Sequence, residues 1–260
     1  MSNKEKLHIT FLGTGTSSGV PMIACHCEAC ESLNTKDKRL RSSILIESPN
    51  TTLVVDTTPD FREQMLRTKN DRLDAVLFTH AHKDHIAGLD DVRAYNYFQK
   101  KAMRVFATQD TQTQLRREFY YAFEEHKYPG IPQLDVHTIG YNPFSINEIE
   151  VIPIRVWHHK LEVIGFRMGK FTYITDANKI DDDQKELIKG SEILVVNALR
   201  KEKHISHFTL SEAIDLIEEL QIPRAYLTHI SHQLGLHDIV EKELPPYIHL
   251  AYDGLTLDIE

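Results

Sequence analysis

The sequence contains no apolar run long enough to cross a membrane. No segment approaches the roughly 20 consecutive apolar residues that a transmembrane helix needs. The first residues are mostly polar and lead directly into a strand-like run, so the apolar core of a secretion signal is absent as well. These absences predict a cytoplasmic protein with no membrane partner.

Positive charge is scarce too. The chain has 30 Lys and Arg residues against 38 Asp and Glu residues, which gives a formal net charge of -8. Proteins that bind nucleic acid regardless of its sequence rely on a basic surface that displaces counterions from the phosphates. The charge balance therefore argues against broad nucleic-acid binding, although it leaves room for a local basic patch.

Cysteine is rare, and all three cysteines lie close together, at Cys25, Cys27 and Cys30. An odd number of thiols at such short spacing does not make a disulfide framework in a reducing compartment. Three thiolates suit zinc in a closed tetrahedral site if a fourth ligand completes it, and His232 is the candidate. Three buried thiols without a metal are the alternative. We expect one structural zinc ion at this group.

Histidine, in contrast, is abundant, with 15 residues, and the densest group follows an apolar run at residues 75–78. His80 and His82 can face one ion, whereas Asp84 and His85 follow on the next bend and can face a second. Imidazole and carboxylate groups are ligands that suit zinc, manganese or iron. A polar loop at a sheet edge is also a usual place for a functional site. The pattern predicts a metal-dependent hydrolase.

Short β-branched runs alternate with helix-like segments, which is typical of a layered α/β domain. Helices are expected over Pro59 to Lys69, Asp110 to Glu125 and Thr209 to Leu220, and the run Asp181 to Asp183 is expected to start another. No feature marks a domain boundary, so residues 1–260 are expected to form a single domain. The expected strands cover residues 8–12, 43–46, 52–56, 75–78, 104–107, 150–154, 165–167, 171–174, 193–196, 225–228 and 247–248.

The pattern His-x-His-x-Asp-His after an apolar strand resembles the signature of the metallo-β-lactamase fold superfamily. His158, Asp176 and His229 are similar to the remaining motifs of that superfamily, in the same order, each near the end of an expected strand. The resemblance covers nearly the whole chain. It implies a four-layer αββα sandwich that carries two divalent metals, zinc or manganese.

The resemblance also implies which residues serve which ion. The neighbouring His159 competes with His158 for one position. Asp56, which follows an expected strand, could orient a ligand histidine from behind it. One metal would be held by His80, His82 and His158, and the other by Asp84, His85 and His229, with Asp176 bridging the two.

Further features narrow the resemblance. The glycine-rich segment from Gly13 to Pro21, the cysteine group and the segment from Thr228 to His232 resemble the phosphoribosyl 1,2-cyclic phosphate phosphodiesterases. That branch is related to the tRNA 3′-processing endonucleases. Taken alone, the glycine-rich segment lacks the lysine of a P-loop, so we expect it to form a tight turn.

Asp84 and His207 are the expected catalytic residues. His207 resembles a position at which related phosphodiesterases keep a histidine near the leaving group, where it can donate a proton. His204 is the fallback for this role, and a capping or surface histidine is the alternative interpretation. Arg93 either binds a substrate phosphate or pairs with an aspartate just before it.

The predicted function is hydrolysis of a small phosphodiester, linear or cyclic, by a hydroxide held between two divalent ions. A tRNA 3′-processing type of endoribonuclease is one alternative. A non-catalytic carrier of the kind suggested for pyrroloquinoline quinone synthesis is the other. The expected partner is the small substrate rather than nucleic acid, and a homodimer is compatible with the sequence.

Overall fold

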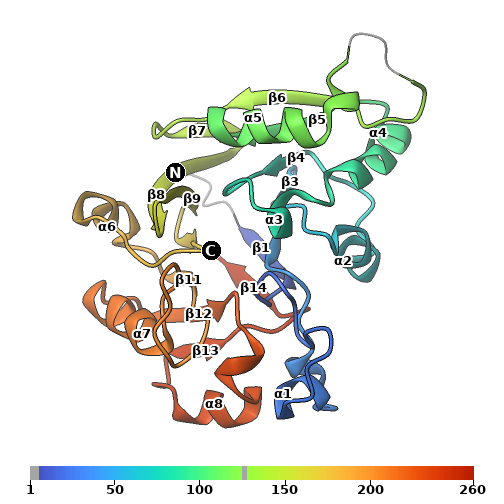
Figure 1. Ribbon diagram of the computed structural model, residues 1–260. Coiled ribbons are helices and arrows are strands. Elements are labelled where there is room, and N and C mark those ends of the chain that lie inside the picture. Colours follow the sequence, from blue (N-terminus) through green and yellow to red (C-terminus); the bar gives the residue numbers. More distant parts are fainter. Residues whose placement is uncertain (1–5, 125–127) are drawn as a thin grey trace.

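The computed structural model describes residues 6–124 and 128–260. Two expectations fall on residues outside these ranges. One is the absence of a secretion signal in the first five residues, and the other is the end of a helix at Glu125. The described strands form two seven-stranded sheets that lie face to face, with helices on both outer faces (Figure 1). This is the expected αββα sandwich of four layers.

The first sheet has the strand order β14-β1-β2-β3-β4-β5-β6. Neighbours from β3 to β6 are parallel, whereas β14, β1, β2 and β3 pair antiparallel. The strands are β1 (Leu7–Gly13), β2 (Ser43–Glu47), β3 (Thr52–Val55), β4 (Ala75–Leu77), β5 (Met103–Ala107), β6 (Leu134–Thr138) and β14 (Thr256–Ile259).

The second sheet has the order β13-β12-β11-β10-β9-β8-β7. Strands β10 to β13 are parallel, and β7 to β10 form an antiparallel meander. The strands are β7 (Phe144–Ile146), β8 (Ile149–His158), β9 (Leu161–Met168), β10 (Phe171–Tyr173), β11 (Ile193–Asn197), β12 (Arg224–Thr228) and β13 (Ile248–Leu250).

Short helices fill the connections. The 3-10 turns are η1 (Thr35–Asp37), η2 (Leu89–Val92), η3 (Tyr120–Ala122) and η4 (His232–Leu234). The α-helices are α1 (Glu28–Glu31), α2 (Phe61–Thr68), α3 (Lys83–Ile86), α4 (Arg93–Gln99), α5 (Gln109–Glu118), α6 (Asp182–Ile188), α7 (Leu210–Glu219) and α8 (His237–Glu243). No helix of the described residues is long and apolar enough to cross a bilayer.

Alternating side chains explain why the strands are apolar on both faces. In β3, Leu53 and Val55 lie in the core between the two sheets, whereas Val54 lies in the outer core with Phe61 and Met65 of α2. Successive residues of a strand point to opposite faces, so a strand covered on both sides needs a continuous apolar run. The two sheets therefore hold a common core, and each has a second core under its own helices.

The helix starts were partly predicted. Helix α7 begins with the capping box of Thr209 and Glu212, as expected, and α6 begins within the aspartate run. The expected cap at Asp110 is wrong, because Thr108 accepts from the Thr111 backbone and α5 starts earlier. That helix also ends earlier than expected, at Glu118, where the chain turns into η3.

Candidate metal centre

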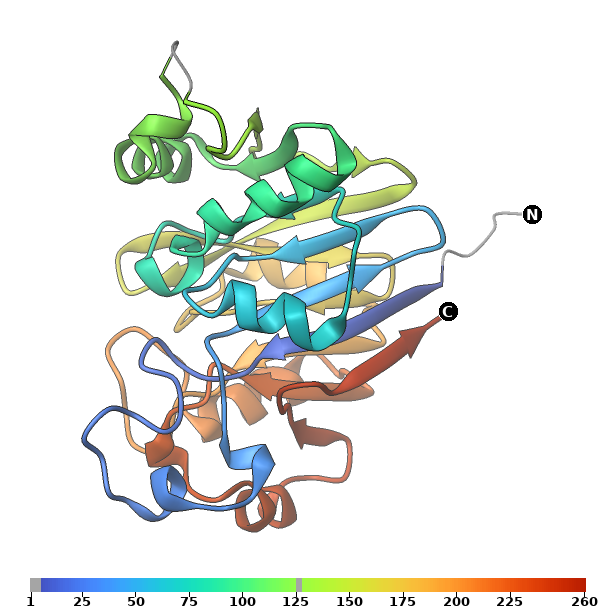
Figure 2. The same ribbon diagram turned by 90° about the vertical axis from the view of Figure 1, so that its right-hand side faces the viewer.

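The candidate ligands follow four strands whose ends meet at one edge of the sandwich. His80 and His82 come after β4, His158 ends β8, Asp176 follows β10 and His229 follows β12. Figure 2 shows β14 ending at one edge of the sheets and the loop after β1 extending from the opposite edge. The fold thus brings together ligand residues that are far apart in the sequence.

Asp176 lies at the middle of this group. Its Oδ1 is 3.1 Å from His229 Nδ1 and 3.4 Å from His85 Nε2, whereas its Oδ2 is 3.8 Å from His80 Nε2. Asp84 joins from α3, with its Oδ2 3.2 Å from His85 Nε2. The two oxygens of one carboxylate therefore face two different sets of histidines.

Three sets of potential ligand atoms share this carboxylate. In each set the atoms lie within 4.8 Å of one another. This clustering fits two neighbouring cations that have one carboxylate in common. The sets are Asp84, His85, Asp176 and His229; His80, His82 and Asp176; and His158, Asp176 and His207.

His158, rather than His159, faces the group. The His158 ring centroid is 5.1 Å from that of His82 and 4.5 Å from that of His207. His158 Nδ1 lies 2.8 Å from the carbonyl oxygen of Ser206, to which it can donate, and this leaves Nε2 free to bind a metal. His159 is exposed, at a backbone φ of 58°.

Asp56 holds His85 from behind. Its carboxylate is fully buried and accepts from His85 Nδ1 at 2.8 Å, which turns the other ring nitrogen toward Asp84 and Asp176. The same carboxylate accepts from the backbone N–H of Thr79 at 2.9 Å and from its hydroxyl at 2.8 Å. The supporting role expected for Asp56 thus matches its position. Thr79 is an additional support that the sequence analysis did not single out.

The charges and free nitrogens of the site fit a divalent cation. Burial disfavours a charged His85, but Asp176, Asp84 and Asp56 outweigh burial and raise the pKa of His85 well above its usual value. His80 Nε2 and His85 Nε2 are buried and make no hydrogen bond with another described residue, although carboxylate oxygens of Asp84 and Asp176 lie 3.2 and 3.4 Å from His85 Nε2. Buried lone pairs and buried carboxylates are both costly unless a cation or donor compensates them. Metal ions would satisfy both.

Backbone strain also gathers here. Asp56, Asp176 and His229 have φ values of 65°, 56° and 54°. Residues other than glycine cost free energy in this left-handed region, and such strain clusters at functional sites.

The cysteine group contacts His232, which follows His229 of the candidate metal centre closely in the sequence. His232 Nδ1 is 3.4 Å from Cys25 Sγ and 3.2 Å from Cys27 Sγ, and with Cys30 the four ligand atoms lie within 4.8 Å of one another. The hydrogen bond from His232 outweighs burial and lowers the pKa of Cys27 to about 6. A thiolate and an imidazole at this spacing are suited to zinc.

The glycine-rich segment packs against Ile230, which lies between His229 of the metal centre and His232 of the cysteine group. The backbone of Ile230 exchanges hydrogen bonds with Thr14 and Thr16, at 2.9 and 3.0 Å. A Cβ atom on Gly13 would lie 2.0 Å from the carbonyl oxygen of Arg41, so only glycine fits there. The segment therefore has the tight, structural role that was expected of it.

Comparison with known proteins decides the family. The model of the β-lactamase superfamily domain matches residues 51–230. The chain belongs to this superfamily. A crystal structure of a diphosphatase from the PhnP family superposes with a TM-score of 0.92 and 37% identity, covering 98% of this chain and 97% of that one. The branch expected from the motifs is confirmed.

Other known proteins resemble the chain over different lengths. An octanoyltransferase of Porphyromonas gingivalis is 39% identical over 96% of this chain, which spans only 51% of that protein. A coenzyme PQQ synthesis protein B of Methylorubrum extorquens is 30% identical over 97% of this chain and 100% of its own length. The Zn²⁺-bound PqqB of Methylobacterium extorquens shares the fold, with a TM-score of 0.80 at 20% identity.

The other candidate residues, His207, His204 and Arg93, lie at different distances from the candidate metal centre. The His207 ring is stacked 4.8 Å from His229, and burial, followed by His229, lowers the pKa of His207 to about 2. A bound anion would raise that pKa again by favouring the charged ring. His204 stands farther out, 5.1 Å from His207 between ring centroids. Arg93 begins α4 and pairs with Asp90 at 2.8 Å, the structural alternative considered for it.

Proposed function

We propose that this protein is a dinuclear metal-dependent hydrolase of small phosphodiesters, linear or cyclic. The observation that carries the proposal is the placement of Asp176, whose Oδ1 faces His85 and His229 while Oδ2 faces His80. A carboxylate placed in this way suits two neighbouring ions. Similarity to a PhnP-family diphosphatase supports phosphorus chemistry rather than lactam hydrolysis.

The ligand set also explains why the substrate would be anionic. Two divalent ions, when bound, would polarise a phosphoryl oxygen and lower the pKa of a water molecule enough to provide a nucleophile at neutral pH. Asp84 and Asp176 offset only part of the charge of such a pair, because the other proposed ligands are neutral histidines. The remaining positive charge favours a phosphodiester over a neutral ester.

His207 is the proposed proton donor to the leaving oxygen. It lies beside His158 and His229, and its buried Nδ1 has no hydrogen-bond partner among the described residues. A general acid contributes about 10²- to 10⁴-fold to a rate of this kind. His207→Ala should therefore lower kcat by about 10²-fold or more on a diester with a poor leaving group, and by much less with p-nitrophenolate, which needs no proton. His137→Ala removes a partly exposed histidine that pairs with Asp135 and serves as the matched control.

A substrate panel tests the proposed function. The protein, loaded with zinc or manganese, is assayed on bis-p-nitrophenyl phosphate, a cyclic nucleotide, a nucleoside diphosphate, an octanoyl thioester and a precursor tRNA. We expect turnover of the small diesters. Cleavage of the tRNA alone would defeat the proposal in favour of the endoribonuclease alternative, and turnover of the thioester alone would point to acyl chemistry.

A non-catalytic carrier is the second candidate. The observation in its favour is the full-length similarity to a coenzyme PQQ synthesis protein B, at 30% identity. A protein that binds its metals but turns over no member of the panel would support the carrier and contradict the hydrolase.

A further inference from the structure

Asn197, the last residue of β11, is a fully buried polar side chain that pairs with the chain next to Asp176. It is 0% exposed, and the sequence analysis did not single it out. Its Oδ1 accepts from the backbone N–H of Ala177 at 2.7 Å, and its Nδ2 donates to the backbone C=O of the same residue at 2.9 Å. One amide side chain thus holds both backbone groups of the residue that follows Asp176.

This side chain continues the sheet where the backbone pairing stops. Strand β10 ends at Tyr173, and Asp176 then turns the chain with a φ of 56°. Ala177, just after the turn, is 0% exposed. A buried backbone group is costly when it has no hydrogen-bond partner. The amide of Asn197 takes the place of a further strand residue and stabilises the turn that carries Asp176.

The same amide connects two other segments of the site. The carbonyl oxygen that it holds also accepts, at 2.7 Å, from the backbone N–H of Phe208, the residue after His207. Asn197 itself is in register with Thr228 of β12, the residue before His229. Three segments that carry candidate site residues therefore meet at one side chain.

We propose that Asn197 is a positioning residue of the metal centre. Its amide fixes the turn that presents Asp176 and, through the shared carbonyl oxygen of Ala177, the loop that presents His207. Because both polar groups of the amide are bound to Ala177, Asn197 is not itself a ligand. Groups that orient metal ligands change metal affinity by about 10- to 100-fold when they are removed.

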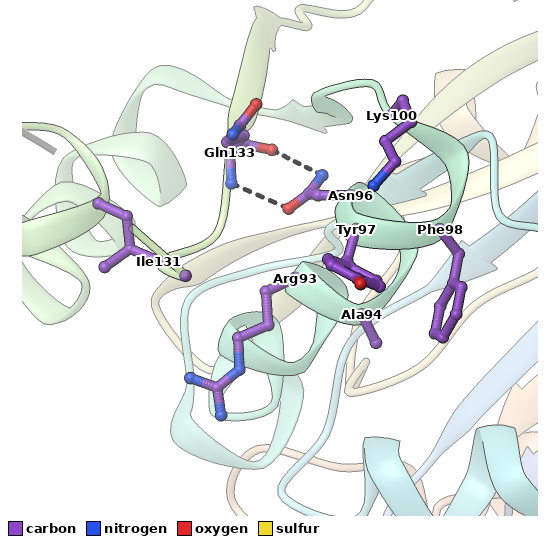
Figure 3. Close-up of a pocket in the computed structure, with 9 residues that line it drawn as sticks. Arg93, Ala94, Asn96, Tyr97, Phe98, Lys100, Ile131 and Gln133 are labelled. Atoms are coloured by element: carbon purple, nitrogen blue, oxygen red, sulfur yellow. Dashed lines mark hydrogen bonds between the residues drawn. The ribbon is translucent and has the colours of Figure 1, made fainter. Parts of the chain in front are cut away.

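The first sheet offers a matched control. Asn96 of α4 holds the backbone of Gln133 in the same way, since its Nδ2 donates to the C=O at 3.1 Å and its Oδ1 accepts from the N–H at 2.9 Å (Figure 3). Neither residue belongs to the candidate metal centre. A variant at Asn96 therefore loses an equivalent pair of hydrogen bonds without changing the support of the metal ligands.

Manganese binding, followed through the electron paramagnetic resonance of the free aqueous ion, tests the proposal without relying on turnover. Thiolates favour zinc, so manganese reports on the site built from carboxylates and histidines. We expect at least ~10-fold weaker binding for Asn197→Leu, which keeps a branched side chain but cannot hold Ala177. Asn96→Leu should bind manganese like the wild type. Urea denaturation of the metal-free proteins compares the loss of stability in the two variants.

A second variant covers the case in which Asn197→Leu does not fold. Asn197→Asp keeps an oxygen for the N–H of Ala177 but offers no donor to its C=O. The added negative charge by itself would tighten cation binding, so weaker binding reports the lost positioning. Manganese affinity at the wild-type level in the folded Asn197 variants, or an equal loss in Asn96→Leu, would overturn the proposal.

The effect on His207 has its own measurement and rests on the proposed function. On the two kinds of diester used for His207→Ala, Asn197→Leu should lower kcat about 10-fold more with the poor leaving group, because a displaced ring donates its proton less well. An equal loss with both leaving groups would overturn this part of the proposal. If the wild type binds manganese but hydrolyses no diester, the proposed function fails, and the manganese affinities still decide the role of Asn197.

Discussion

Asp176 is almost fully buried at 2% exposure and is held in a left-handed backbone conformation with φ of 56°. The pull of His229 and His85 outweighs burial and keeps the pKa of Asp176 well below its usual range, so its negative charge persists at acidic pH. A buried charge of this kind is costly unless positive charge surrounds it. At this residue, fold stability and metal binding depend on the same compensation.

Asp176→Asn tests this dependence, since it removes the charge and keeps the shape. We expect the two ions of the centre to be lost or bound at least ~100-fold more weakly, as measured by elemental analysis after dialysis, with hydrolysis falling about 10³-fold. Asp183→Asn neutralises an exposed aspartate of α6 and should leave the metal content unchanged. Full metal content in the Asp176 variant would contradict a bridging role.

His237 makes stability depend on pH in a predictable direction. It is buried and accepts from the guanidinium of Arg39 at 3.1 Å, and burial, followed by Arg39 and Lys36, lowers its pKa from 6.5 to about 4. The unfolded chain thus binds a proton at His237 before the folded one does. Its contribution to stability is complete above pH 6.5 and is lost as the pH falls toward 4.

Urea denaturation of the wild type and of His237→Gln, from pH 7 to pH 4.5, measures this contribution. The difference in the free energy of unfolding between the two proteins should change by about 2 kcal/mol over that range, against the wild type at the acidic end. A constant difference would show that His237 does not titrate differently in the folded and unfolded states.

At the scale of elements, the turn between β12 and α8 serves two sites. His229 faces Asp176, and a few residues later His232 faces Cys25 and Cys27. Because the backbone of Ile230 forms hydrogen bonds with Thr14 and Thr16, the turn is held in place independently of any metal at the cysteine group. The two sites should therefore be separable.

Cys27→Ser provides the separation. We expect elemental analysis to show the loss of one zinc per chain while the two ions of the metal centre remain, because the other ligands and the Ile230 hydrogen bonds are untouched. Ser18→Ala changes the neighbouring loop without touching the cysteine group and is the matched control. Loss of all metal from the Cys27 variant would show that the sites are not independent.

The sequence predicted the elements whose signals are local. The dense histidine run after β4 and the capping box at Thr209 can each be recognised from a few consecutive residues. Strand β14 was not predicted, because its short Thr256–Ile259 segment is fixed by pairing with β1 at the other end of the chain. Helix α4 was missed because Tyr97 and Phe98 face outward, which hides its apolar periodicity.

Within the candidate site, the sequence predicted which residues could bind metal, but not the groups that hold those residues in position. The sequence favoured His158 over His159 only through its resemblance to the family, because the direction of each ring depends on the turn after β8. The carbonyl oxygen of Ser206, which accepts from His158, carries no signal of its own in the sequence. Backbone contacts of this kind appear only when the fold is known.

At the scale of the whole molecule, the shared core between the sheets supports the prediction that the chain is one folding unit. Trp157 in β8 is the single tryptophan and reports on the second sheet alone. We expect its fluorescence and the far-ultraviolet circular dichroism to change at the same temperature during unfolding. Two separate transitions would indicate two domains that unfold independently.

The position of the ligands at the seam between the sheets has a consequence for the order of assembly. His80, His82, Asp84 and His85 follow a strand of the first sheet, whereas His158, Asp176 and His229 follow strands of the second. During synthesis the first group is made before the second, but without Asp176 it is only part of the proposed set of ligands. We therefore expect ions to be retained only after the two sheets have docked, when both groups of residues are in place. Metal bound at this seam is therefore expected to slow unfolding and to leave the rate of folding nearly unchanged.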